Sequence, residues 1–246
     1  MSDIVGAARG AEVVILGEVH DNPGHHARQA QVLARLGPSA IVFEMISAEE
    51  AGRVTPELAG DTGALAAALD WETSGWPDFA LYAPLFAFGA EVPIYGAHVD
   101  RETAQGAFEA GAAAVFAGDA ARFGLTGALP EAEQAAREAE QMAAHCDALP
   151  PEILPGFVEA QRLRDAALAE AALAALAAHG PPVAIITGNG HARRDWGVPA
   201  LLAGAAPDVT VFALGQVEDV PEGAVPFDLW ALSDPVDRPD PCAAFR

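Results

Sequence analysis

The chain has 246 residues, of which 13 are Lys or Arg and 35 are Asp or Glu, so its formal net charge is -22. Nucleic acids and anionic membrane surfaces bind proteins through clustered basic side chains, so this charge balance argues against both as partners. Every basic residue is an arginine, and the absence of lysine excludes Schiff-base chemistry and a lysine-dependent phosphate-binding loop.

The N-terminal segment, residues 1–6, has no basic cluster followed by a long apolar run, so we expect no signal peptide. No apolar run in the sequence has the length needed to span a bilayer. Two cysteines, Cys146 and Cys242, form no Cys-x-x-Cys motif and do not suggest a disulfide framework. We therefore expect a cytoplasmic protein in which Cys146 is a small buried residue of a helix.

The first predicted element is a buried strand over residues 13–16, where four apolar and mostly β-branched residues follow one another. The strand ends at Gly17 in a predicted loop that carries one Glu, one Asp and three His in nine residues. A loop that only turned the chain would not need so many titratable groups. A helix is expected from Ala27 to Leu36, closed by Gly37. The candidate site residues of this loop are Glu18, His20, His25 and His26.

The next predicted strand, Ala40 to Met45, is apolar except for Glu44 near its end. This acid is either a solvated residue that starts the following loop or a third site residue at a strand end, and the sequence favours neither interpretation. A further strand is expected over residues 92–100. Its His98 is a weaker candidate than His20, because a single histidine at a strand end is more often structural.

Residues 101–180 are rich in alanine and are predicted to form a helical insertion between two strands. In the last of these helices, Gln161 and Asp165 share a face with apolar residues by the three-to-four residue period. Buried polar groups need partners. These two side chains therefore either brace the loop that holds His191 or lie on a face that is partly exposed to solvent.

The strand predicted over residues 183–187 leads into Gly188-Asn189-Gly190-His191 and repeats the pattern of the first strand, since both end in Gly-x-x-His. Open parallel sheets bind ligands beyond the carboxyl ends of their strands. We therefore expect His20 and His191 to share one site. Arg193, in the segment that follows, either clamps a carboxylate or propionate group or faces solvent.

Two more strands are predicted near the C-terminus, over residues 209–214 and 227–232. Strands that alternate with helices predict an α/β fold with a central, mostly parallel sheet flanked by helices. Composition shows no linker, so we expect one domain over residues 1–246 with the helical insertion at about 101–180.

Four residues at the predicted strand ends combine carboxylate and imidazole groups, which suit Zn, Mn, Fe or Co. A metal there would activate water for attack on a substrate. Asp21 or His26 could orient the metal ligands. A metal-free alternative uses a His and a Glu as general bases, and spacing does not decide between the two. The candidate catalytic or metal-binding residues are Glu18, His20, Glu44 and His191.

These motifs resemble the ChaN-like family of haem-binding uptake proteins, within the Tiki/TraB and erythromycin-esterase-like superfamily. The resemblance covers nearly the whole chain in the expected order. It rests on Leu16-Gly17-Glu18-Val19-His20-Asp21-Asn22 with His25-His26, Phe43-Glu44-Met45, Trp71 and Trp76, Ala160-Gln161 with Arg164-Asp165, Gly188-Asn189-Gly190-His191 through Gly197-Val198-Pro199, and Asp237-Arg238-Pro239-Asp240-Pro241-Cys242.

The resemblance implies an α/β fold with both Gly-x-x-His loops in one cleft. It also implies haem binding and iron acquisition, with haem held at a homodimer interface. Elsewhere in the superfamily the cleft is associated with divalent metal in Tiki-like proteases and with water activation by His and Glu in esterases. The residues that we assign to cofactor binding on this basis are His25, His26, Gln161, Asp165 and Arg193.

The sequence departs from the family pattern in two ways. ChaN-like proteins are typically exported lipoproteins, whereas this chain shows neither a signal peptide nor a lipobox cysteine. The family places a haem-binding Tyr in the helix ahead of the Gln and Asp pair, where this chain has Phe157, and the only tyrosines are Tyr82 and Tyr95. We predict a haem- or iron-binding protein, with a metal-dependent hydrolase as the alternative, so enzyme activity stays open.

Overall fold

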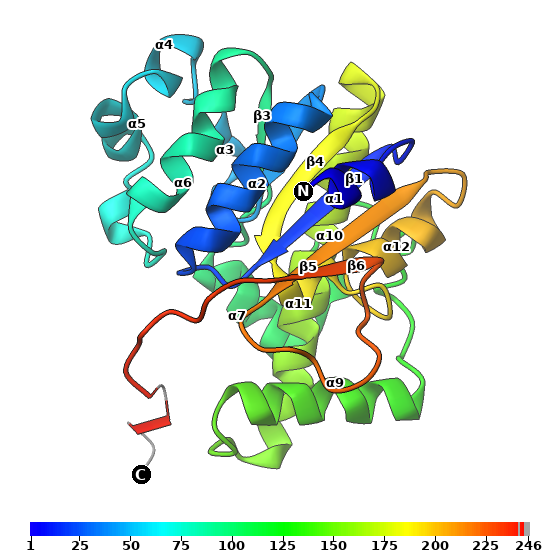
Figure 1. Ribbon diagram of the computed structural model, residues 1–246. Coiled ribbons are helices and arrows are strands. Elements are labelled where there is room, and N and C mark those ends of the chain that lie inside the picture. Colours follow the sequence, from blue (N-terminus) through cyan, green and yellow to red (C-terminus); the bar gives the residue numbers. More distant parts are fainter. Residues whose placement is uncertain (241, 244–246) are drawn as a thin grey trace.

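The computed structural model describes residues 1–240, 242 and 243, and it shows a six-stranded sheet between two layers of helices (Figure 1). All strand pairs are parallel, in the order β3-β2-β4-β1-β5-β6. The predicted α/β class, with a parallel sheet and a helical insertion, is confirmed. The strands are β1 (Val13–Glu18), β2 (Ala40–Phe43), β3 (Ile94–Gly96), β4 (Val183–Gly188), β5 (Val211–Val217) and β6 (Leu229–Leu232).

The helices are α1 (Ser2–Ala7), α2 (Pro23–Leu36), α3 (Ala48–Ala51), α4 (Pro56–Ala59), α5 (Thr62–Ala68), α6 (Phe79–Phe86), α7 (Arg101–Ala110), α8 (Ala112–Val115), α9 (Glu131–Ala144), α10 (Leu154–His179), α11 (Asn189–Ala192) and α12 (Val198–Ala205), with short 3-10 turns at Trp71–Thr73, Ala87–Ala90 and Pro151–Ile153. Within the described part of the chain, none of these helices is long and apolar enough to cross a bilayer.

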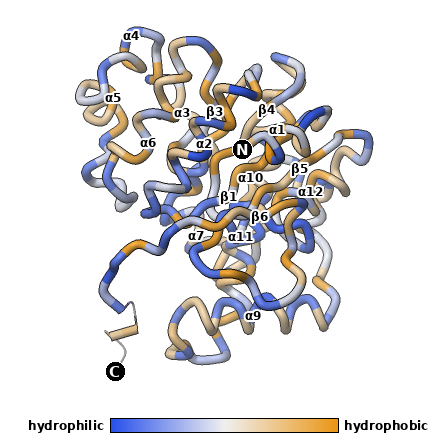
Figure 2. The backbone as a smooth tube through the Cα atoms, viewed as in Figure 1, coloured by the Kyte–Doolittle hydropathy of each residue, from blue (hydrophilic) through white to orange (hydrophobic). Residues whose placement is uncertain are grey.

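Each strand sends alternate side chains to opposite faces of the sheet, as strand geometry requires. On β1, Val14 and Leu16 belong to the buried cluster that includes residues of α1, α2, α3, α5 and α6, whereas Val13 and Ile15 belong to the cluster that includes residues of α7, α8, α10 and α12. Helix α9 lies outside both layers, at the foot of the molecule (Figure 1). Its hydrophilic residues alternate with hydrophobic ones along the helix (Figure 2), and Arg137 is its one buried residue.

Two of the predicted boundaries near the strand ends were wrong. Helix α2 begins at Pro23 instead of Ala27, because the side chain of Asn22 accepts hydrogen bonds from the backbone N–H groups of the first turn and proline is favourable there. His25 and His26 therefore lie in a helix and not in a loop. The segment that carries His191 was also expected to be a loop, but it forms the single helical turn α11.

The prediction for the cysteines was wrong as well. Cys146 and Cys242 form a disulfide across 96 positions of sequence, and Cys146 lies in the turn after α9 rather than inside a helix. The C-terminal segment runs down the molecule toward α9 (Figure 1), a return that sequence spacing does not reveal. Disulfides are rare in the reducing cytosol. The bridge therefore weighs against the cytoplasmic location, which stays a prediction.

Gly96 at the end of β3 gives a test of this packing. A Cβ atom there would overlap the backbone carbonyl of Ser47, so Gly96→Ala should lower the free energy of unfolding by about 1–3 kcal/mol. Gly6→Ala in α1 is the control, because no heavy atom lies within 4 Å of its added Cβ. That variant should gain about 0.5–1 kcal/mol from helix propensity. Denaturant unfolding measures both changes, and equal midpoints would contradict the packing.

Candidate functional site

Three neighbouring strands end in the residues that form the candidate site. Glu18 is the last residue of β1, Gly188 is the last residue of β4, and Glu44 directly follows β2. Strand β4 lies between β1 and β2, so the three ends are adjacent. The chain leaves β1 and β2 toward one helical layer and leaves β4 toward the other. This reversal opens a crevice of the kind in which open α/β sheets bind ligands.

Glu18 is 2% exposed, and its carboxylate has four polar neighbours. One oxygen accepts hydrogen bonds of 2.9 Å from Nδ1 of His20 and 2.9 Å from the hydroxyl of Tyr82. The other accepts a 2.7 Å bond from Nε2 of Gln29 and lies 3.5 Å from Nδ1 of His26. A buried carboxylate requires such compensation. The same contacts fix the ring of His20 by its Nδ1 atom.

A second polar cluster lies at the ends of β2 and β4. One oxygen of Glu44 accepts a 2.7 Å bond from the hydroxyl of Thr187 and a 2.8 Å bond from the backbone N–H of Gly188. The other oxygen lies 3.5 Å from Nε2 of His191. On its far side, His191 donates from Nδ1 to Asp165 of α10, at 2.7 Å. This ring is therefore held between two carboxylates.

Gly188 allows the two clusters to approach each other. A Cβ atom at this position would lie 2.8 Å from Nε2 of His20 and 3.7 Å from Glu44. The imidazole of His20 therefore lies directly over the end of β4. Trp76 contacts its ring from outside, with 4.9 Å between ring centroids. The last residue of the strand thus has to be small for His20 to face the second cluster.

The carboxylates control the charge of both histidines. Burial alone would lower the pKa of His191, but the charges of Glu44 and Asp165 raise that pKa to about 9. Burial also opposes the positive form of His20, but its hydrogen bond to Glu18 and the charge of Glu44 raise its pKa. Burial favours neutral Glu44, yet the charges of His191 and His20 lower its pKa. The raised pKa therefore favours the imidazolium form of His191 at neutral pH.

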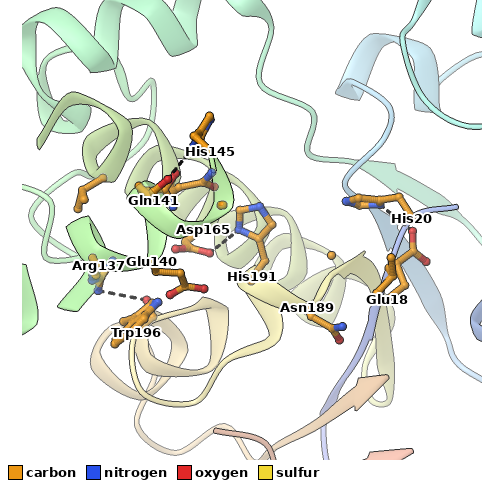
Figure 3. Close-up of a pocket in the computed structure, with 16 residues that line it drawn as sticks. Glu18, His20, Arg137, Glu140, Gln141, His145, Asp165, Asn189, His191 and Trp196 are labelled. Atoms are coloured by element: carbon orange, nitrogen blue, oxygen red, sulfur yellow. Dashed lines mark hydrogen bonds and ion pairs between the residues drawn. The ribbon is translucent and has the colours of Figure 1, made fainter. Parts of the chain in front are cut away.

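Two hollows open above these clusters. The strand-end hollow, about 430 Å³, lies between β1, α9, α10 and α11, and the aromatic hollow, about 630 Å³, lies beside it. Figure 3 shows the strand-end hollow with Glu18 and His20 on one side and His191, Asp165 and His145 on the other. The aromatic hollow contains Trp76, Phe108, Phe157, His98, Arg101 and Arg164. Both hollows share His20, Gln141, His145, Gln161 and His191.

Comparisons with known proteins agree with this architecture. The model of the family described as haem-binding uptake, Tiki superfamily, ChaN matches residues 4–202. The chain belongs to this family. It is similar in structure to ChaN of Campylobacter jejuni, with a TM-score of 0.67 and 18% identity over 90% of this chain and 88% of that chain. It is also similar to the type III effector HopBA1, with a TM-score of 0.50 and 16% identity over 94% and 92%. No curated protein sequence matches.

In this ChaN-family fold, the predicted site residues fall into two groups. The structure brings Glu18, His20, Glu44 and His191 together at one crevice. Gln161 and Asp165 lie in its wall, and Asp165 braces His191 as one of the two sequence interpretations expected. For Glu44, the structure shows 7% exposure and contact with the site rather than a solvated loop residue.

The other three predicted residues do not border either hollow. His25 is fully buried and its Nδ1 accepts from the backbone N–H of Val19, while burial and Arg28 lower its pKa to about 4. His26 donates from Nε2 to the backbone carbonyl of His20 at 2.8 Å. Arg193 pairs with Asp195 and Glu140 and lies over the ring of Trp196. These contacts support the segments around the site.

Among the described residues, no group of three or more His, Cys, Asp or Glu side chains is arranged to hold a metal ion. Both carboxylate oxygens of Glu18 and one oxygen of Glu44 already accept hydrogen bonds from the surrounding protein. The predicted use of the four strand-end residues as a metal site therefore has no support in the side-chain arrangement.

Several residues of the site were not found from the sequence. Gln29 and Tyr82 complete the shell of Glu18, and each lies on a helix whose inward face the sequence did not resolve. Arg101 and Arg164 line the aromatic hollow. His145 was not among the candidate residues, but it borders both hollows. Of these residues, Arg164 could have been proposed from the sequence, because it is the direct neighbour of the candidate Asp165.

The charge of His191 makes stability depend on pH. Its folded-state pKa of about 9 is above the usual 6.5, so the stabilisation is complete below pH 6.5 and is lost as pH rises through about 9. The contribution is at most about 3 kcal/mol. His191→Asn should therefore destabilise the protein more at pH 6 than at pH 10 in denaturant unfolding. His179→Asn, at the far end of α10, is the control, and a pH-independent effect of His191→Asn would contradict the assignment.

Proposed function

We propose that this ChaN-family protein binds haem and that the aromatic hollow is the binding site. The family is one of haem-binding uptake proteins, and the Campylobacter jejuni structure is described as cofacial heme binding to ChaN. The observation that carries the proposal is the composition of the hollow. It combines aromatic rings and imidazoles with two arginines that lack an acidic partner among the described residues.

The size and apolar lining of the hollow suit a flat, hydrophobic cofactor. Its volume of about 630 Å³ lies within the range of about 300–1,000 Å³ that is typical of small-molecule sites. Trp76, Phe108 and Phe157 are each partly exposed in it. The rings of Phe108 and Phe157 meet edge to face, with centroids 5.3 Å apart. Such rings offer apolar surface to a porphyrin face.

The two arginines suit the acidic groups of the same cofactor. Arg101 and Arg164 line the hollow, and neither has an ion pair or a side-chain hydrogen bond within the described part of the chain. Six of the other ten arginines in the described part of the chain are paired with carboxylates, as Arg137 and Arg162 are. Two unpaired guanidinium groups in one hollow favour an anionic ligand, such as the propionates of haem.

The donor set also suits haem iron. His20, His98 and His145 line the aromatic hollow, and imidazole is a common axial ligand of haem. Gln161 lies in the same wall. The homodimer that the resemblance implies, with haem at its interface, stays a prediction.

Haemin titration followed by absorbance tests the proposal. Arg101→Ala and Arg164→Ala should each weaken haemin binding by about tenfold to a hundredfold, because each removes a charge-assisted hydrogen bond of about 1.5–3 kcal/mol. Arg35→Ala, an exposed arginine of α2, makes the same change in net charge and should leave affinity unchanged. Wild-type protein without a spectral change on adding haemin would reject the function. An equal loss in Arg35→Ala would reject the role of the two arginines.

We propose hydrolysis of an ester or amide as a second candidate function, on one observation. His191 and Glu44 lie 3.5 Å apart, and His20 faces them across Gly188. In this arrangement Glu44 or neutral His20 would accept a proton from water. The imidazolium of His191 would stabilise negative charge on the carbonyl oxygen under attack. The metal-free form of the hydrolase hypothesis thus has a geometric basis.

Hydrolysis of p-nitrophenyl acetate tests the second function. His191→Asn should lower kcat/KM by about a hundredfold, within the range typical of general acid–base groups, because the variant lacks the imidazolium. His179→Asn should hydrolyse the ester at the wild-type rate. A wild-type rate equal to the spontaneous rate, or equal rates for wild type and His191→Asn, would reject hydrolysis at this site.

A further inference from the structure

His145 lies directly after α9, where it lines both hollows. It is partly buried, and its ring centroid is 4.8 Å from that of Phe157 on α10. Figure 3 shows it on the same side of the pocket as His191 and opposite His20. An imidazole in this position borders the hollow that the proposed function assigns to haem.

One ring nitrogen of His145 is already engaged. Its Nδ1 lies 2.7 Å from the backbone carbonyl oxygen of Gln141. Because a carbonyl oxygen only accepts hydrogen bonds, Nδ1 carries the hydrogen, and in the neutral ring the lone pair is on Nε2. Histidines that bind metals show the same arrangement, in which the second nitrogen donates to a carbonyl and fixes the ring orientation.

The turn that holds His145 is fixed on its other side by a covalent bond. Cys146, the next residue, is joined to Cys242 of the C-terminal segment. Cys146 and Asp147 have φ angles of 62° and 55°, in the left-handed region that residues other than glycine rarely adopt. The helix end and the disulfide therefore hold this imidazole in place before any ligand arrives.

The two histidines at the strand ends are less suited to bind iron. His191 has a carboxylate at each nitrogen, with Asp165 at 2.7 Å and Glu44 at 3.5 Å. His20 donates from Nδ1 to Glu18, and its Nε2 lies close over the backbone at the end of β4. His191 therefore has no ring nitrogen away from a carboxylate, and the free nitrogen of His20 faces the end of β4.

The remaining donors lack either support or the right position. His98 is exposed, and its ring has no hydrogen bond among the described residues that would select one tautomer. The hydroxyl of Tyr82 donates to Glu18 at 2.9 Å, and that of Tyr95 lies 2.9 Å from His179. Neither tyrosine borders the aromatic hollow. A tyrosine ligand of this chain is therefore excluded there.

We propose that Nε2 of His145 is the axial ligand that this chain supplies to haem iron. This inference rests on the proposed haem function and adds the identity of the ligand. His145 would hold the iron from the wall that α9 and α10 form together, where the neighbouring Phe157 has no donor atom. The carbonyl of Gln141 then orients the ligand and strengthens it as a donor.

Haemin titration of the full-length oxidised protein, read by absorbance and electron paramagnetic resonance, tests the ligand. His145→Ala should weaken haemin binding by about tenfold or more, and it should lose the spectrum of a histidine-ligated haem. Added imidazole should restore that spectrum, which a folding defect would not allow. His145→Tyr should shift the spectrum to that of a tyrosinate-ligated haem. His98→Ala should keep the histidine spectrum, and His179→Ala, outside both hollows, is the matched control and should behave as wild type.

The outcomes separate the ligand from the function. Wild-type protein that shows no haemin spectrum would overturn both the haem site and this inference. Wild type and His145→Ala with the same haem spectrum would overturn the inference alone. A loss of the histidine spectrum in His98→Ala, and not in His145→Ala, would also overturn it and would assign the ligand to His98.

Discussion

The buried carboxylate of Glu18 is the constraint on which the arrangement of the site depends. It ends β1, and it accepts hydrogen bonds from Gln29 on α2, from Tyr82 on α6 and from His20. An unpaired carboxylate in such a place would cost several kcal/mol, so the three partners and the strand end are held together as one unit. The orientation of His20 follows from this unit, because its ring has one nitrogen on Glu18.

The second helical layer reaches the same place through different residues. Asp165 on α10 holds His191, and His191 pairs with Glu44 at the end of β2. One layer thus orients His20 and the other orients His191, and Gly188 at the end of β4 is the point at which the two meet. The reversal of chain direction around β4 makes this convergence possible, since each histidine is supported from its own side of the sheet.

Much of this arrangement was predictable from local patterns. Apolar runs that end in Gly-x-x-His predicted β1, β4 and the proximity of His20 and His191, and helical spacing placed Asp165 on the face that reaches His191. The pattern misplaced His25 and His26, because the capping of α2 by Asn22 starts the helix early and turns both rings inward. The disulfide was missed because its partners are 96 positions apart.

His145 was missed because it follows α9, a helix that contributes little to the core. The same property of α9 suggests how members of this fold come to differ in their sites. Helix α9 lies outside both helical layers, and its one buried residue is Arg137. Apart from Met142, its apolar residues are alanines, so no bulky side chains mark its inward face in the sequence. A helix that contributes so few residues to the core can change its inward residues without disturbing Glu18 or the strand ends. The side of the site that α9 forms can thus acquire a different ligand residue while the polar residues at the strand ends stay the same. This is one way in which a shared fold comes to hold different sites.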